Sequence, residues 1–368
     1  MGWSPWRAVV GFGVVSLAAD MVYEGARSVT GPLLASLGAS AVLVGLVTGA
    51  GEAMALVLRL AFGTLADRSG RYWTLTLAGY LLTAVCVPAL AIAPFVGGAG
   101  LALACVLILA ERTGKAVRSP AKTALLAHAA GAVGLGRGFA VHKALDQVGA
   151  IAGPLLVAGI AALTGALWPA LAALVVPGGL AVALLVWIRG RMGDPVDAAT
   201  PSPPAAVSPS EPGLPTATGP GPAAGPATAA APTQPLSAQF WLFAASAGAA
   251  TAGLVTFGVI SYHLTIDRVV TVAAVPVLYA AAMGAAALAA LATGWTYDRL
   301  QGRVLFALPF LVAAVPPLAF SSSPATAVLG GALAGALYSR SVPALVAVVG
   351  VTQLGTLVLL VATLRRRH

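Results

Sequence analysis

The first long apolar run of this sequence carries three ionisable residues at helical spacing. Asp20, Glu24 and Arg27 are separated by four and three positions, which places them on one face of a helix. Ionisable groups inside an apolar helix are costly, and they normally face a cavity or a charged partner. A carboxyl group there can exchange a proton or bind a substrate, and Glu24 and Asp20 are the candidates for that role. A structural ion pair between Glu24 and Arg27, near the outer end of the helix, is the alternative.

A second apolar run carries a carboxyl group at greater depth. Glu52 lies near the middle of residues 41–66, with no other charged residue within one helical turn. Arg59, two turns further on, is the partner that the spacing favours within this run. Glu52 and Arg59 are therefore further candidates for coupling to protons or substrate. A neutral, protonated Glu52 between helices is the alternative.

A short charged motif occurs twice, each time between two apolar runs. Its residues are Gly63, Asp67, Arg68, Gly70 and Arg71 in the first copy, and Asp298, Arg299 and Arg303 in the second. Charged residues make up only 8% of the chain, so two matching clusters at corresponding points indicate two related membrane halves.

The composition places most of the chain in lipid. Hydrophobic residues make up 59% of the sequence, and the mean hydropathy is +0.94, far above that of a water-soluble domain. Only helices and closed barrels satisfy their backbone groups in a bilayer. The apolar runs are continuous and roughly 20 residues long, which favours helices over the alternating strands of a barrel. We therefore predict an all-α membrane protein. Cys86 and Cys105 lie inside apolar runs and are expected to act as small hydrophobic residues.

The apolar runs predict six membrane spans in the first half of the chain. Their expected bounds are about Arg7–Thr30, Ala41–Ala66, Trp73–Ala93, Gly98–Thr113, Val141–Leu163 and Leu167–Ile188. Lys and Arg residues concentrate at alternate ends of these spans, and the opposite loops near Ala39, Val96 and Thr164 carry none. The positive-inside rule then places the N-terminus in the cytoplasm. The net charge of +9 is explained by the anionic inner leaflet.

The second half of the chain is separate and short. Residues 193–236 are rich in Pro, Ala, Gly and Thr, which predicts a disordered cytoplasmic linker between a six-helix bundle, residues 1–192, and a C-terminal bundle, residues 237–368. The second bundle has room for about four to five helices. Its expected spans are Phe240–Tyr262, Val270–Thr293, Val304–Phe320 and Val342–Leu364. Ala325–Leu337 is too short to cross the membrane untilted, so we expect a re-entrant segment or an outer-leaflet extension.

Two helical bundles, a cytoplasmic linker and the repeated Gly-x-x-x-Asp-Arg loop resemble the major facilitator superfamily. The stretches Asp20–Pro32, Gly114–Pro120 and Gly138–Asp146 resemble its bacterial drug-exporter-like branch. The resemblance implies a two-bundle fold that opens alternately to either side of the membrane. It also implies that the repeated loops latch helix ends and control this swing. After Phe320 the sequence departs from the family, because the tenth helix and the start of the eleventh are missing.

Two further groups of residues carry a possible role. The first, Gly149, Gly153 and Pro154, resembles the glycine–proline motif of the fifth helix in proton-coupled exporters, with ordinary close helix packing as the alternative. The second is a cytoplasmic polar cluster that we expect to form a solvated helix end, and its members are Glu111, Arg112, Lys115 and Arg118.

His142 and Asp146 stand one turn apart at the start of the expected fifth span. We expect them to be residues of the membrane–water interface, with a proton relay as the alternative.

The sequence holds no signature of an enzyme or of a metal protein. The glycine-rich stretch 134–138 lacks the Lys-Ser/Thr ending of a phosphate-binding loop. The four histidines are scattered without metal-ligand spacing. We therefore expect no metal, no cofactor, no catalytic residues and no nucleic-acid partner, and an ion gradient as the energy source.

These observations favour a secondary active transporter that exports a small molecule in exchange for protons by alternating access. Its expected partners are the substrate, protons and the lipid bilayer, and the chain is expected to be a monomer. The expected location is the inner (plasma) membrane, with both termini in the cytoplasm. The alternative is a transport-deficient or regulatory membrane protein that retains a partial fold. A membrane enzyme is a third class, disfavoured because no catalytic constellation is present.

Overall fold

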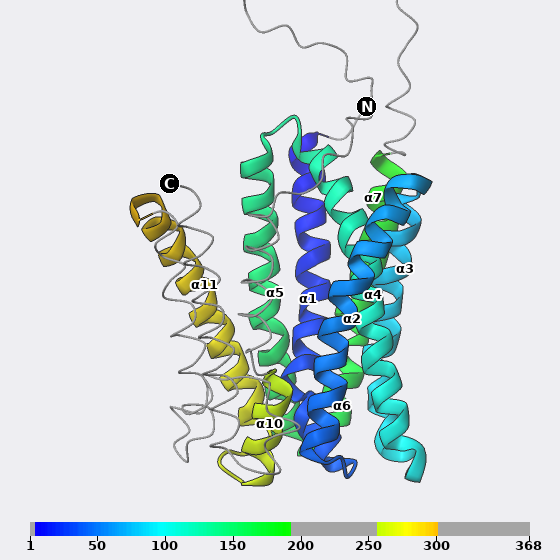
Figure 1. The fold of residues 1–368 in the computed structure, drawn as a ribbon, viewed down its shortest axis with the longest axis vertical. Coiled ribbons are helices and arrows are strands. Elements are labelled where there is room, and N and C mark those ends of the chain that lie inside the picture. Colours follow the sequence, from blue (N-terminus) through cyan, green and yellow to red (C-terminus); the bar gives the residue numbers. More distant parts are fainter. Residues whose placement is uncertain (1–3, 193–255, 301–368) are drawn as a thin grey trace, which may run out of the picture.

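The structure, a computed structural model, describes residues 4–192 and 256–300, with side chains described to residue 288 (Figure 1). Every regular element in these ranges is a helix, which confirms the all-α fold class. The predicted linker and the expected spans after residue 300 lie outside the described residues. So does the start of the expected span Phe240–Tyr262.

The first half forms one bundle of long helices. They are α1 (Pro5–Ser36), α2 (Ala41–Ser69), α3 (Tyr72–Ala89), α4 (Gly100–Ala130), α5 (Leu135–Thr164), α6 (Leu167–Ala173) and α7 (Val175–Met192). Two short 3₁₀ helices, Leu90–Phe95 and Gly97–Ala99, connect α3 to α4. In the described part of the second half, α10 (Phe257–Ile266) and α11 (Ala274–Leu300) follow. Within these ranges, five helical segments are long and apolar enough to cross a membrane: α1, α2, α3 extended to Phe95, α5, and α6 with α7.

Local sequence signals set the helix ends. Ser40 caps α2 by accepting a hydrogen bond from the backbone N–H of Leu43. Gly70 ends α2 in the left-handed region, with φ 64°, which suits a residue without a Cβ. The predicted sixth span is divided at Leu174 into α6 and α7. Pro177 has no N–H to offer the carbonyl of Ala173, and its ring disfavours a continuous helix at this point.

Helix α1 lies inside the bundle, where it packs mainly against α5 and also against α7, α10 and α4 (Figure 1). α1 and α5 run in the same direction, and Gly149 and Gly153 place the backbone of α5 directly against α1. A Cβ at Gly149 would clash with the carbonyl oxygen of Leu17, and one at Gly153 with that of Met21. This matched register brings polar side chains of α1 and α5 to the same height.

Helix α4 corrects one expectation from the sequence. The fourth span was predicted to end at Thr113, followed by a polar segment, whereas α4 continues to Ala130 and α5 begins at Leu135. The helix persists because its charged side chains are held inside the bundle: Glu111, Arg112 and Arg118 are buried. At 31 residues, α4 is about 46 Å long, longer than the hydrocarbon core of a bilayer.

The described part of the second half packs against the first. α10 lies against α1 and α2, and the hydroxyl groups of Thr48 and Thr256 are hydrogen bonded at 2.7 Å. α11 lies against α5, where Gln147 Nε2 donates to the carbonyl oxygen of Met283 at 3.5 Å. The two halves are therefore in contact both at one end of the bundle and along α5.

Candidate functional site

The central ion cluster, which we define as Glu24, Arg27, Glu52, Glu111 and Arg112, joins α1, α2 and α4 near their middles. Arg27 Nη2 lies 2.8 Å from Glu52 Oε1, and Arg112 Nη1 lies 3.4 Å from the same oxygen. Arg27 Nη1 is 3.8 Å from Glu24 Oε2, and Arg112 Nε is 3.7 Å from Glu111 Oε2. Glu52 thus bridges two arginines on different helices.

Tyr23 contacts the arginines of this cluster. Its hydroxyl accepts a hydrogen bond from Arg112 Nη1 and another, at 3.5 Å, from Arg27 Nη1. The Lys115 ammonium lies 3.5 Å from the centre of the Tyr23 ring and the Arg112 guanidinium 4.7 Å from it. One aromatic ring therefore holds three cations close together through its face and its hydroxyl.

A small cavity of about 20 Å³ opens beside the cluster, lined by Tyr23, Arg27, Glu111 and Arg112 among others. Glu111 Oε1 and Arg112 Nε are buried and have no hydrogen-bond partner among the described residues. The space suffices for about one water molecule, and polar groups face it. A water here would complete the hydrogen bonding of both side chains.

Tyr279 of α11 connects the cluster to the second half. Its hydroxyl donates a hydrogen bond to Glu24 Oε2, and its ring packs edge-on against Phe257, with the centroids 4.5 Å apart. The side chain is buried. Among the described residues of the second half, Tyr279 is hydrogen bonded to the central ion cluster, and it links α11 directly to a carboxyl group of α1.

The cluster and the neighbouring Lys115 together hold equal numbers of carboxylates and cations, and one carboxyl group is more exposed than the others. Three carboxylates, those of Glu24, Glu52 and Glu111, face three cations, those of Arg27, Arg112 and Lys115. The Glu52 side chain is 41% exposed, against 12% for Glu24 and 8% for Glu111. Glu52 is therefore the most exposed carboxyl group of the cluster, and it contacts two arginines.

A second polar group, the α1–α5 carboxyl pair, lies one turn away on α1. Asp20 and Asp146 are within hydrogen-bonding reach of each other. Ser16 donates to Asp146 Oδ1 at 2.7 Å, and Lys143 donates to Asp146 Oδ2. Lys122 of α4 donates to the Ser16 hydroxyl at 3.2 Å and lies 3.3 Å from His142 Nε2. Asp146 and His142 are thus inside the bundle: His142 is buried, whereas a position at the membrane–water interface was expected.

The structure brings together only some of the coupling candidates. Glu24, Arg27 and Glu52 meet in the central ion cluster, while Asp20 belongs to the carboxyl pair. Arg59, the expected partner of Glu52, is exposed on α2 and takes part in none of the ion pairs found among the described residues. The spacing along one helix was misleading because Arg27 and Arg112 reach Glu52 from neighbouring helices.

The first copy of the repeated motif lies at the end of α2. Asp67 and Arg68 stand in its last turn and Gly63 about one turn earlier, so the motif is partly helical where a loop was expected. We call Asp67, Arg68, Gly70 and Arg71 the α2–α3 corner. Its charged side chains are exposed, and Tyr72 donates a hydrogen bond to Asp67 at 3.4 Å. In the second copy, Asp298 and Arg299 end α11, and Arg303 lies outside the described residues.

The prediction that the cytoplasmic polar cluster forms a solvated helix end is wrong. Glu111, Arg112 and Arg118 are buried and Lys115 is half-buried, all facing other helices. Arg118 donates a hydrogen bond to Thr83 and lies over the Tyr80 ring, 4.7 Å from its centre. Aromatic rings and hydroxyl groups replace water around these cations, which is why the segment remains helical.

Sequence reasoning also missed several partners of these residues. Tyr23, Tyr279 and Ser16 were not singled out, because a lone tyrosine or serine in an apolar run gives no signal of a long-range partner. Lys122 could have been found, since it continues the series of cations along α4 at helical spacing.

Among the described residues, no group of three or more potential metal ligands is present.

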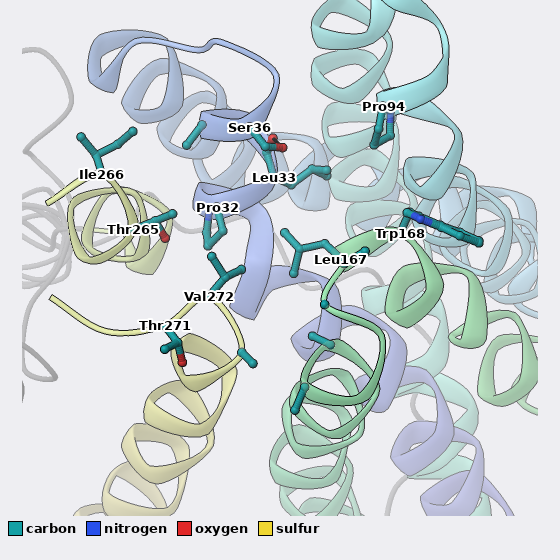
Figure 2. Close-up of a pocket in the computed structure, with 16 residues that line it drawn as sticks. Pro32, Leu33, Ser36, Pro94, Leu167, Trp168, Thr265, Ile266, Thr271 and Val272 are labelled. Atoms are coloured by element: carbon teal, nitrogen blue, oxygen red, sulfur yellow. Dashed lines mark hydrogen bonds between the residues drawn. The ribbon is translucent and has the colours of Figure 1, made fainter. Parts of the chain in front are cut away.

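An apolar pocket of about 680 Å³ lies at the opposite end of the bundle from the α2–α3 corner. Figure 2 shows side chains from the end of α1, the α5–α6 connection and the α10–α11 connection around it. Its lining includes Pro32, Leu33, Trp168, Ile266, Thr271 and Val272. The pocket therefore lies where the two halves meet, about 12 Å along α1 from Glu24.

Comparison with known proteins finds relatives that are similar in sequence and solved structures that are similar in fold. Uncharacterized proteins of Mycobacterium tuberculosis (Rv2265, strain ATCC 25618 / H37Rv) and Mycobacterium bovis (Mb2288, strain ATCC BAA-935 / AF2122/97) are each 49% identical over 341 residues, covering 90% of this chain and 76% of each relative.

Two solved structures of a bacterial homolog to the human lysosomal transporter Spinster have a similar fold. The inward-facing, unoccupied form has a TM-score of 0.59 at 14% identity, covering 97% of this chain and 80% of that one. The inward-facing, occupied form has a TM-score of 0.60 at 15% identity, covering 98% and 79%. The family model of the Major Facilitator Superfamily matches residues 12–366. With this match over nearly the whole sequence, the chain belongs to the Major Facilitator Superfamily, a family of membrane transporters.

Proposed function

We propose that this chain is a proton-coupled antiporter that exports a small molecule by alternating access, as in the drug-exporter-like branch of the family. The observation that carries the proposal is the central ion cluster, in which Glu52 is the most exposed carboxyl group and holds Arg27 and Arg112. Carboxyl groups placed like this in membrane helices mark ion or proton pathways. Glu24, Asp20, Arg27 and Glu52 are the coupling residues of the proposal, and Arg59 is omitted because it lies outside the cluster.

Protonation of Glu52 changes the forces inside the cluster. A neutral Glu52 no longer attracts Arg27 and Arg112 as an anion, so both guanidinium groups turn to the remaining carboxylates, Glu24 and Glu111. Glu24 also accepts the hydrogen bond of Tyr279 from α11. A stronger bond between Arg27 and Glu24 weakens the hold of Glu24 on Tyr279, and this couples proton uptake to the contact between the two halves.

The polar ends of the helices support the proposed orientation. The N-terminus of α1 and the C-termini of α2, α4 and α7 lie at the same end of the bundle (Figure 1). Arg7, Arg68, Arg71, Arg189 and Arg191 belong to that end. The positive-inside rule then gives an N-terminus in the cytoplasm of a plasma-membrane protein. In the same orientation the α2–α3 corner is a cytoplasmic gate, and the apolar pocket serves a substrate with an apolar portion at the other end.

Proton flux in reconstituted vesicles tests the proposal. The purified chain is placed in liposomes containing a pH-sensitive dye, with ethidium as the exported probe and an imposed pH gradient. We expect ethidium movement that stops when a protonophore collapses the gradient, and proton movement in the opposite direction. Glu52→Gln and Glu24→Gln are expected to reduce both fluxes by about tenfold or more while the variants remain folded.

Unchanged coupled flux in both variants would reject the carboxyl assignment. Ethidium flux that ignores the pH gradient would reject proton coupling. A regulatory protein without transport is the second candidate, favoured by the expectation from the sequence that the family's tenth helix is missing after Phe320. It predicts specific ligand binding with no flux of either kind.

A further inference from the structure

The α1–α5 carboxyl pair lies outside the central ion cluster and joins different helices. Asp20 is one helical turn after Ser16 on α1, and Ser16 donates to Asp146 on α5 at 2.7 Å. The register between the helices is fixed by Gly149 against Leu17 and by Gly153 against Met21. Because Asp20 follows Ser16 by one turn on the same face of α1, it lies close to Asp146, and the two carboxyl groups are within hydrogen-bonding reach.

Two carboxyl groups within hydrogen-bonding reach can form a hydrogen bond with each other only if one of them carries a proton. With both ionised, neither could donate, and two like charges would face each other in a poorly solvated place. With both protonated, the neighbouring lysines would face no anion. The state that satisfies every neighbour has one proton between the two carboxyl groups, and the pair then carries a single negative charge.

The surrounding charges support a single shared proton. On α5, Lys143 donates to Asp146, and its side chain is 67% exposed, which gives the pair an edge toward water. On α4, Lys122 reaches the pair through the Ser16 hydroxyl, and Lys115 lies over the neighbouring Tyr23 ring. Glu24 of α1 and His142 of α5 complete the titratable neighbours. His142 faces the Lys122 ammonium through Nε2, so this nitrogen accepts rather than donates.

We propose that Asp20 and Asp146 bind one proton between them and that this pair is a second proton-binding site of the coupling pathway, besides Glu52. The existence of the shared proton depends only on the geometry of α1, α4 and α5, whereas its role in coupling rests on the proposed function. Asp146 is the new member of the site: the proton is held on either carboxyl oxygen, and the exposed edge at Lys143 is its route to water. Loss of the proton leaves two anions, which the lysines then attract more strongly.

Infrared spectroscopy detects the shared proton directly. The full-length chain in lipid nanodiscs is brought from neutral to alkaline pH, and the carbonyl stretch of a protonated carboxylic acid is recorded in the difference spectrum. We expect such a band in the unmodified protein, and we expect its loss at neutral pH in both Asp20→Asn and Asp146→Asn. In either variant the remaining carboxyl group no longer faces a like charge, and the lysines keep it ionised.

Matched variants control for folding and for other carboxyl groups. Asp146→Glu retains a carboxyl group and should keep the band. Asp267→Asn, the same change at a residue of the α10–α11 connection that is about half exposed, should leave the band unchanged. A band that survives in both Asn variants, or that disappears in only one, would overturn the shared proton. An unmodified protein with no band would overturn it as well.

Transport measurements on the same proteins separate this inference from the proposed function. If the unmodified protein shows proton-coupled flux, Asp146→Asn should lower it by about tenfold or more. Coupled flux that persists in Asp146→Asn would show that the pair is not part of the coupling pathway. A band that behaves as expected, in a protein that shows no coupled flux, supports the shared proton and rejects the proposed function alone.

Discussion

The central ion cluster and the α2–α3 corner both combine an acidic residue with arginines, yet they lie in opposite environments. In the cluster, Arg112 is buried and bound by Glu52, Glu111 and Tyr23. At the corner, Asp67, Arg68 and Arg71 are exposed, and one long hydrogen bond joins Asp67 to Tyr72. The same residue types therefore differ in what they contribute: buried charges depend on their partners for stability, while exposed charges are free to act on whatever approaches them.

The largest effect is expected when the cluster loses its shared cation. Arg112→Gln leaves Glu111 buried and without its arginine, and Glu52 with one arginine instead of two. Removing one partner of a buried ion pair destabilises a protein by about 3 kcal/mol or more. Thermal unfolding in detergent should show a clear fall in the unfolding temperature. Arg59→Gln is the matched control on an exposed helix face, and its effect should stay within about 0.5 kcal/mol. Equal effects of the two variants would contradict the burial of the cluster.

An intermediate effect is expected from a single hydroxyl group. Tyr279→Phe keeps the ring against Phe257 and removes only the hydrogen bond to Glu24. A hydrogen bond to a charged group contributes about 1.5–3 kcal/mol. Tyr72→Phe removes the corresponding bond to Asp67 at the exposed corner, where a loss below about 0.5 kcal/mol is expected. The unfolding temperatures of the two variants give the comparison directly, and a larger fall for Tyr72→Phe would reverse it.

The smallest effect on stability is expected from Asp67→Asn. The carboxyl group is exposed at the end of α2, so the free energy of unfolding should change by less than about 0.5 kcal/mol. If the corner acts as a gate, the rate of transport should nevertheless fall several-fold, because the latch acts during the swing and not in the resting fold. A transport rate equal to that of the unmodified protein, measured in the same vesicles, would remove the corner from the mechanism.

Much of the fold could be predicted from the sequence because the apolar runs are long and their ends are marked. Gly70, Gly165 and the serine caps set ends that differ from the expected bounds by a few residues for several helices. The largest miss was α4, where Glu111, Arg112 and Arg118 were taken as signs of water. Sequence patterns report charge but not what surrounds it, and here tyrosine rings, hydroxyl groups and carboxylates of other helices surround the cations.

Part of the site could also be predicted from the sequence. Glu24, Arg27 and Glu52 stood out because charges are rare in apolar runs, and all three meet in the central ion cluster. Their partners did not stand out. Arg27 lies 25 positions before Glu52 and Arg112 lies 60 positions after it, so no helical spacing connects them. Tyr279 comes from the other half of the chain. Contacts of this kind follow from how helices pack, which a single sequence does not encode in a readable way.

The close approach of α1 and α5 at Gly149 and Gly153 has a consequence for how the molecule can move. Two backbones that touch without intervening side chains cannot slide past each other, so α1 and α5 should travel as a single lever. Any hinge must then lie on the other faces of α1, where α10 packs against α1, the Tyr279 hydroxyl of α11 bonds Glu24, and Thr48 of α2 bonds Thr256. Rocking of the two halves would break these contacts and leave the close packing of α1 on α5 intact.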